Sequence, residues 1–252
     1  FFIFLISHKF LVDLFYQKLR LMKKLLLILL CAPLIGKGQC VGTVGCMDPI
    51  AVNYNSHATC PSFCLYGFQT YVPDDNFEQE LINLGYDNIL DDYVTTSNIS
   101  SVAFLNLGNK NISDLTGIQD FTSLNSLWCY NNNLSVLDLS NNTNLTILYC
   151  NHNQLVSLNV GSNVLLQNLR CYNNNLTSLD LSNNSALVYL KAQSNNLSSL
   201  DIRNGNNTNI TTFNGASNSN LLCIDVDDPV YFSANWSNNI SSWTSFSSDC
   251  AT

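Results

Sequence analysis

Apolar and polar residues between Leu124 and Leu200 follow a pattern that repeats every 21 residues. Three leucine positions and one asparagine position keep this step through four copies. They are Leu124, Leu145, Leu166 and Leu187; Leu127, Leu148, Leu169 and Leu190; Leu134, Leu155, Leu176 and Leu197; and Asn132, Asn153, Asn174 and Asn195. One copy is too small to bury its own leucines, so the pattern predicts a stack of structural repeats.

Each repeat is expected to contain a short strand. Leu127 and Cys129 alternate with Trp128, as a strand with one buried face requires. Stacked copies would place these strands about 4.8 Å apart in one parallel sheet. A second alternating piece recurs at 137–139, 158–160, 179–181 and 200–202. We expect it to form short extended segments on the opposite wall. The repeated asparagine is expected to form a structural ladder by binding backbone groups of adjacent turns.

Different patterns flank the repeat region, which we place at residues 101–222. In residues 68–100, Asp74 or Asp75 can cap a helix with an apolar face at Phe77 and Leu81. This segment is predicted to be an N-terminal helical cap over the open end of the stack. Residues 223–252 contain Cys223 and Cys250 at either side of one segment, which predicts a disulfide-closed C-terminal cap.

The beginning of the chain indicates export. A basic start at Met22 is followed by a short apolar run and small residues, so residues 22–39 are predicted to be a signal peptide and residues 1–21 to be translated upstream sequence. The alternative is a membrane anchor, but the apolar run is shorter than the ~20 residues that a span needs. We expect a secreted or cell-surface protein whose mature chain is not inserted in the membrane.

Residues 40–67 form a cysteine-rich module. Cys40, Cys46, Cys60 and Cys64 could bind zinc, but in an exported chain two disulfides are favoured. Three pairings are possible and the sequence does not choose among them. By contrast, Cys129, Cys150 and Cys171 occupy one repeat position, which Ala192 continues. We interpret these three as free thiols that fill the core, rather than as a redox or metal ladder.

The motifs together resemble a known class of protein. The repeats have the form L-x-C-x-N-N-x-L-x-x-L-D-L-S of leucine-rich repeats, and the chain is similar to secreted leucine-rich-repeat proteins of the Bacteroidetes type. VPDDNFEQELINLGYDN resembles their entry helix and CIDVDDPVYFSANW their closing segment. The resemblance implies a leucine-rich-repeat solenoid that mediates binding or adhesion. It also implies that many relatives carry a C-terminal sorting domain.

Charge and composition narrow the function further. The net charge of −8 argues against nucleic acid as a partner. No nucleophile, base and acid can be assembled into a catalytic set, so we expect no enzyme and no cofactor. Asp225, Asp227 and Asp228 could bind calcium, but a solvated acidic turn is favoured and no metal site is predicted.

The outward positions of the main strands predict the binding face. Three rows cross the repeats: Ser126, Ile147, Asn168 and Tyr189; Trp128, Tyr149, Arg170 and Lys191; and Tyr130, Asn151, Tyr172 and Gln193. The candidate ligand-binding residues are the aromatic and basic members, Trp128, Tyr130, Tyr149, Arg170, Tyr172, Tyr189 and Lys191. Aromatic residues also have high strand propensity, so they could merely decorate the sheet.

Two functions therefore remain open. The first is a module that binds a protein or polysaccharide ligand at the cell surface. The second is a structural spacer, without its own ligand, in a larger surface or adhesive assembly. Aromatic and long polar side chains on adjacent strands favour the first, whereas a bland polar row would favour the second.

Overall fold

The computed structural model describes residues 43–45, 47, 55–61 and 68–250. The chain divides into two compact units, residues 1–67 and 68–252. In the first unit, β1 (Val44–Gly45) pairs in parallel with β2 (Cys60–Pro61). No helix among the described residues is long and apolar enough to cross a bilayer.

Several expectations concern residues that the structure does not describe. The upstream segment 1–21, the signal peptide 22–39 and the cysteines Cys40, Cys46 and Cys64 lie outside the described residues. The backbone of Cys60 belongs to β2, but its side chain is not described.

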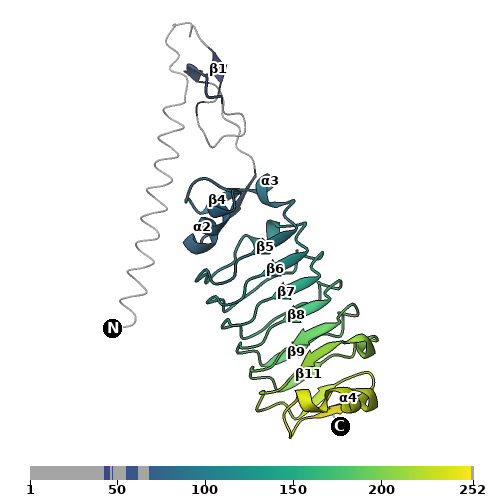
Figure 1. Cartoon of the computed structure of the whole chain (residues 1–252). Helices are drawn as coiled ribbons and strands as arrows, with labels where there is room; N and C mark the ends of the chain where they lie inside the picture. The colour runs from purple at the N-terminus through teal and green to yellow at the C-terminus, as the bar shows by residue number, and fades with distance from the viewer. Residues whose placement is uncertain (1–42, 46, 48–54, 62–67, 251–252) are drawn as a thin grey trace, which may run out of the picture. The chain divides into compact units, whose positions relative to one another are not determined.

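The second unit is built on one six-stranded parallel sheet with the order β12-β10-β8-β7-β6-β5, which we call the main sheet. Figure 1 shows these turns stacked one after another along the solenoid. Its strands are β5 (Phe104–Asn106), β6 (Ser126–Trp128), β7 (Ile147–Tyr149), β8 (Asn168–Arg170), β10 (Tyr189–Lys191) and β12 (Thr212–Asn214). Leu127, Leu148, Leu169 and Leu190 pair in register and are fully buried. The predicted sheet is therefore present, and the first and last turns of the repeat region 101–222 each add one strand to the four central ones.

A second parallel sheet forms the other wall, with the order β14-β13-β11-β9. Its strands are β9 (Ser178–Asp180), β11 (Ser199–Asp201), β13 (Cys223–Asp225) and β14 (Ser245–Ser247). The equivalent residues of the earlier repeats, 137–139 and 158–160, do not form strands, although Leu139 and Val160 are buried. The extended segments predicted for this wall are thus regular strands only from residue 178 onward.

The unit begins with a small antiparallel pair, β3 (Gln69–Tyr71) and β4 (Tyr93–Thr95), and two helices, α2 (Asp75–Asn83) and α3 (Thr96–Ile99). Asp74 caps α2, because its Oδ1 accepts from the backbone N–H groups of Asn76 and Phe77, both at 3.0 Å. The other carboxylate oxygen accepts 2.8 Å and 2.7 Å bonds from the N–H and hydroxyl of Ser113. Asp74 therefore ties the helix to the first repeat.

Two rows of buried asparagine hold the turns together. In the first row, Asn153 Nδ2 donates to the carbonyl oxygens of Cys129 and Cys150 at 2.9 and 3.0 Å, and its Oδ1 accepts from Leu134 N–H. Side chains with the same pattern are Asn132, Asn174, Asn195 and Asn218. This is the geometry expected of the predicted ladder, and Asn218 extends it by one turn.

The second row of asparagines was not predicted. Asn163 Nδ2 donates to the carbonyl oxygens of Leu139 and Asn142, and Asn184 Nδ2 donates in the same way to Val160 and Asn163. Asn142 makes the equivalent bonds one turn earlier. These asparagines also recur every 21 residues, so the signal was present in the sequence.

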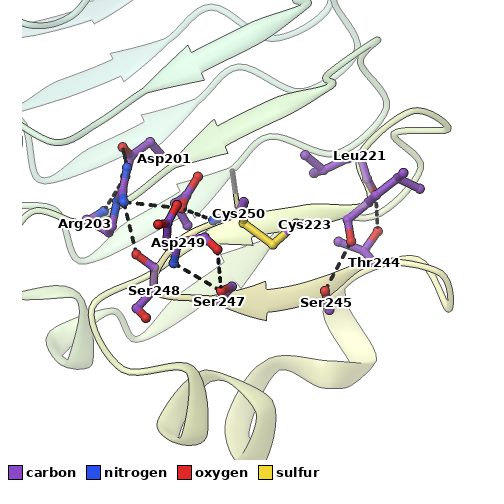
Figure 2. Close-up of a disulfide and its surroundings, with 12 residues drawn as sticks. Asp201, Arg203, Leu221, Cys223, Thr244, Ser245, Ser247, Ser248, Asp249 and Cys250 are labelled. Atoms are coloured by element: carbon purple, nitrogen blue, oxygen red, sulfur yellow. Dashed lines mark hydrogen bonds and ion pairs between the residues drawn. A yellow bond between two sulfur atoms is a disulfide. The ribbon is translucent and has the colours of Figure 1, made fainter. Parts of the chain in front are cut away.

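The last turn is closed by α4 (Pro229–Trp236), capped by Asp228, and by a disulfide between Cys223 and Cys250. Figure 2 shows this disulfide, and dashed lines join Arg203 to Asp201 and to Ser248. The Arg203 guanidinium forms an ion pair of 2.6 Å with Asp201 and donates to the carbonyl of Ser248 at 3.0 Å. The hydrogen bond from Arg203 holds the pKa of Asp201 below its ordinary value.

Candidate functional site

A continuous column of stacked side chains crosses the main sheet. Trp128 and Tyr149 stand on adjacent strands with ring centres 5.3 Å apart and planes 19° from parallel. The guanidinium carbon of Arg170 lies 4.1 Å from the centre of the Tyr149 ring and 5.1 Å from that of Tyr189. On the other side of Trp128, Phe104 of β5 meets it at nearly a right angle, with centres 5.1 Å apart. We call these five residues the aromatic column.

Part of the aromatic column lines a hollow of about 420 Å³. The lining residues are Trp128, Tyr130, Tyr149, Asn151, Arg170 and Tyr172. The ring of Tyr130 lies over Gly108, where a Cβ would overlap the ring. Tyr172 meets His152 edge to face, with ring centres 5.2 Å apart. The hollow thus has aromatic walls whose positions are set by neighbours in the same or adjacent turns.

The structure brings the predicted residues together. All seven candidates are half-buried, and five of them line the hollow, while Tyr189 and Lys191 belong to β10 beside Arg170. Lys191 Nζ lies 5.7 Å from the centre of the Tyr189 ring. Two residues were missed: Phe104, which is 50% exposed, and Asn151 as part of the hollow. Phe104 occupies the first outward row one repeat earlier, so extending the rows would have found it.

Two details of the predicted rows were wrong. Ser126 and Asn151 are buried within these rows rather than open to solvent. Ser126 lies in register between Phe104 and Ile147, and Asn151 still lines the hollow. The third row also lies beyond the strands, because β6 ends at Trp128 and β8 at Arg170. Tyr130 and Tyr172 therefore lie in the loops just after the C-terminal ends of β6 and β8.

Charge is unevenly divided between the two walls. No strand of the main sheet contains an acidic residue, whereas β9, β11 and β13 each end in aspartate. Residues 68–250 contain sixteen acidic residues and only four basic ones. Lys110 pairs with Glu80 at 2.9 Å and Arg203 pairs with Asp201. Within the described part of the chain, Arg170 and Lys191 have no carboxylate within 4 Å.

The acidic groups elsewhere have structural partners. Asp225 accepts a bond from Cys250 N–H, Asp227 from Gly205 N–H and Asp228 from Tyr231 N–H, each at 2.9 Å. Each of the three carboxylates therefore accepts a backbone hydrogen bond in the last turns. A further group of carboxylates, Asp75, Glu78 and Asp92, lies near α2. Both oxygens of the buried Glu78 already accept backbone N–H bonds from residues 91–93.

The three repeat cysteines are fully buried and not bonded to one another. Burial raises the pKa of the Cys150 thiol to about 12 and that of Cys129 and Cys171 well above its ordinary value. At neutral pH these thiols are protonated, whereas the thiolate is the nucleophile and metal ligand. The row therefore consists of free thiols held in the core.

The stacked turns, in-register leucines and asparagine ladder define a leucine-rich-repeat solenoid. No protein-family model matches the chain. A stretch of 75 residues, 30% of the chain, is 36% identical to Internalin J of Listeria monocytogenes and covers 8% of that protein. The solved functional domain of InlJ from Listeria monocytogenes, described as including a cysteine ladder, aligns with a TM-score of 0.55 at 33% identity.

That alignment covers 64% of this chain and 38% of the solved chain. The chain thus spans well under half the length of either protein. The chain is thus similar to an internalin over its leucine-rich-repeat region, and both of these matches come from Listeria rather than from Bacteroidetes.

Proposed function

We propose that this protein is a non-enzymatic binding module that docks a ligand on the main sheet. The observation that carries the proposal is the hollow itself, in which aromatic residues and Arg170 from three adjacent turns converge. Tryptophan, tyrosine and arginine supply most of the binding energy at protein interfaces. Similarity to an internalin favours interaction or adhesion as the general role.

Rigidity of the site supports the same proposal. Each side chain of the aromatic column is held by a neighbour on an adjacent strand, so little side-chain freedom would be lost when a ligand binds. A spacer without a ligand has no need for aromatic residues fixed around a hollow. The proposed ligand is a protein or polysaccharide at the cell surface.

The remaining domain assignments belong to this proposal. We infer that the chain is secreted, that residues 68–100 cap the first turn and that residues 223–252 cap the last. Phe77 supports the N-terminal cap, because it is fully buried and stacks with Phe121 at a ring distance of 6.2 Å. The proposal retains the two disulfides among Cys40, Cys46, Cys60 and Cys64, and the relation to secreted proteins of the Bacteroidetes type.

A pull-down with the full chain, followed by affinity measurements on the captured ligand, tests the function. Substituting Trp128→Ala and Tyr149→Ala together is expected to weaken binding by about 2 kcal/mol or more, since both belong to the hollow. The matched control is Val136→Ala with Val156→Ala, two exposed apolar residues outside the main sheet. Thermal melts establish that each variant folds.

Unchanged affinity of the Trp128 and Tyr149 variant would move the site to the other wall or to a loop. Failure to capture any ligand would favour the structural spacer instead.

A further inference from the structure

The arrangement of the aromatic column restricts the kind of ligand it can bind. Tyr149 has Trp128 against one face of its ring and the Arg170 guanidinium against the other. Trp128 has Tyr149 on one side and Phe104 on the other. The Trp128 and Tyr149 rings lie on successive strands, and each turns its face towards the side chain of the next strand. A ligand approaching from solvent meets their edges, because neighbours within the column occupy their faces.

Ring edges and ring faces attract different groups. The edge of an aromatic ring carries partial positive charge, while the face carries partial negative charge. A neutral sugar ring stacks on an exposed aromatic face, and Tyr149 has none to offer in this arrangement. Edges favour an electron-rich group such as a carboxylate oxygen. Stacking of a sugar ring on Tyr149 is therefore disfavoured.

The charged groups of the site point to the same chemistry. Arg170 is fixed between Tyr149 and Tyr189, so its orientation is set before a ligand arrives. Lys191 is the register partner of Arg170 on the next strand. Neither forms an ion pair within the described residues, although the unit is acidic overall. A pre-oriented guanidinium binds a carboxylate through parallel N–H bonds.

We propose that the main sheet binds an acidic peptide segment of a partner protein, with an aspartate or glutamate carboxylate held by Arg170 and Lys191 beside the ring edges of Trp128 and Tyr149. This inference rests on the proposed function and specifies its ligand. A peptide fits better than an acidic polysaccharide, because a flexible acidic side chain reaches the guanidinium without a sugar ring stacking on the column. The strands of the second wall contain no basic residue, so that wall offers the segment no equivalent of Arg170 and Lys191.

A library of short random peptides displayed on phage, selected against the immobilised full chain, is the direct test. Selected sequences are expected to be enriched in aspartate and glutamate, and binding should weaken as salt screens the charges. The test variant is Arg170→Gln with Lys191→Gln, expected to lower the affinity of the best acidic peptide at least tenfold. Arg170→Lys with Lys191→Arg keeps both charges and should keep most of the affinity. Thermal melts check that each variant folds.

The matched control is Lys110→Gln, which removes one positive charge from a lysine that already pairs with Glu80. Its affinity for the acidic peptide should stay within twofold of the parent chain. Parallel titrations use the same peptide with glutamine and asparagine in place of its acids, polygalacturonate as an acidic glycan, and dextran as a neutral one. Only the acidic peptide is expected to bind tightly.

Three results would overturn the inference. They are no acidic enrichment among selected peptides, equal affinity of the amide peptide, and tighter binding of polygalacturonate or dextran than of any peptide. The experiments also distinguish failure of the proposed binding function from failure of the proposed acidic ligand. If the Trp128 and Tyr149 variant loses the captured ligand while the Arg170 and Lys191 variant keeps it, the binding function stands and the acidic ligand does not. If neither variant has an effect, both proposals fall.

Discussion

The side-chain amide of Asn153 donates a 2.9 Å hydrogen bond to the carbonyl oxygen of Cys129, which belongs to the preceding turn. The same amide group bonds within its own turn to Cys150, and its oxygen accepts from Leu134. One buried side chain therefore satisfies three backbone groups of two successive turns. Backbone groups buried without a partner each cost about 1–3 kcal/mol.

Asn153→Ala is accordingly expected to lower the free energy of unfolding by about 3 kcal/mol or more, since three buried backbone groups lose their partner. Urea denaturation followed by circular dichroism measures the change. An exposed asparagine of the preceding turn gives the control, and Asn133→Ala should change stability by less than about 0.5 kcal/mol. Equal effects from the two variants would contradict the role of the ladder.

Gly108 has no side chain, and this leaves room for the ring of Tyr130, which forms one wall of the hollow. A methyl group at this position would overlap the ring of Tyr130, so Gly108→Ala is expected to displace that ring while costing only about 1–2 kcal/mol of stability. Ligand affinity should fall with little loss of folding, as measured by titration and thermal melting. Gly161→Ala is the control, because Gly161 lies outside the strands of the main sheet and the nearest atom to a Cβ there is Asn159 Oδ1 at 3.2 Å. Lower thermal stability with unchanged ligand affinity would argue against this role of Tyr130.

The disulfide of the last turn closes a loop with a sequence separation of 27. Replacing Cys223 and Cys250 by alanine is expected to cost about 3 kcal/mol of stability through the added freedom of the unfolded chain. Peptide mass spectrometry after alkylation without reduction checks the pairing. In the native protein no label should appear on these two cysteines or on Cys129, Cys150 and Cys171, and denaturant should expose only the last three. Label on Cys223 in native, oxidised protein would exclude the disulfide.

Stability is expected to fall in alkaline solution because of the buried thiols. Burial raises the pKa of Cys150 from its ordinary 9.0 to about 12 in the folded chain. The unfolded chain therefore releases the Cys150 proton first as pH rises. The stability that the protonated thiol contributes is fully present below pH 9 and is lost as pH rises towards 12. The slope is up to about 1.4 kcal/mol per pH unit for each thiol.

Cys150→Ala should accordingly reduce the alkaline slope of the unfolding free energy, as measured by urea titrations between pH 8 and about 10.5. Alanine already occupies this row at position 192, so the variant is expected to fold. An unchanged slope would show that the thiol at position 150 does not titrate differently in the folded and unfolded chains.

The repeat period was sufficient to predict the main sheet, its register and its buried face. Leucines at a step of 21 residues leave one way to stack the turns, and Leu148 and Leu169 pair as that step requires. Candidate binding residues followed from the same alternation, since a strand exposes every second side chain. The composition of the hollow was thus largely predictable from residue positions.

The stacking of side chains was not predictable in this way. Whether Tyr149 offers its face or its edge depends on rotamers that are chosen by Trp128 and Arg170 together, and a sequence pattern carries no such information. The same limit explains the burial of Asn151, which depends on the size of its neighbours. Asn163 was different, because its period was visible and was overlooked beside the stronger leucine pattern.

Each rung of the asparagine ladder involves only its own turn and the one before it. Duplication of a whole 21-residue unit within the gene would therefore preserve every existing rung and add one more. Each such event would lengthen the exposed surface by about 4.8 Å. The end turns also tolerate extra loop residues, since Leu105 pairs with Leu127 and Leu190 with Phe213 at steps of 22 and 23. The solenoid can thus evolve a longer or shorter recognition surface without redesigning its interior.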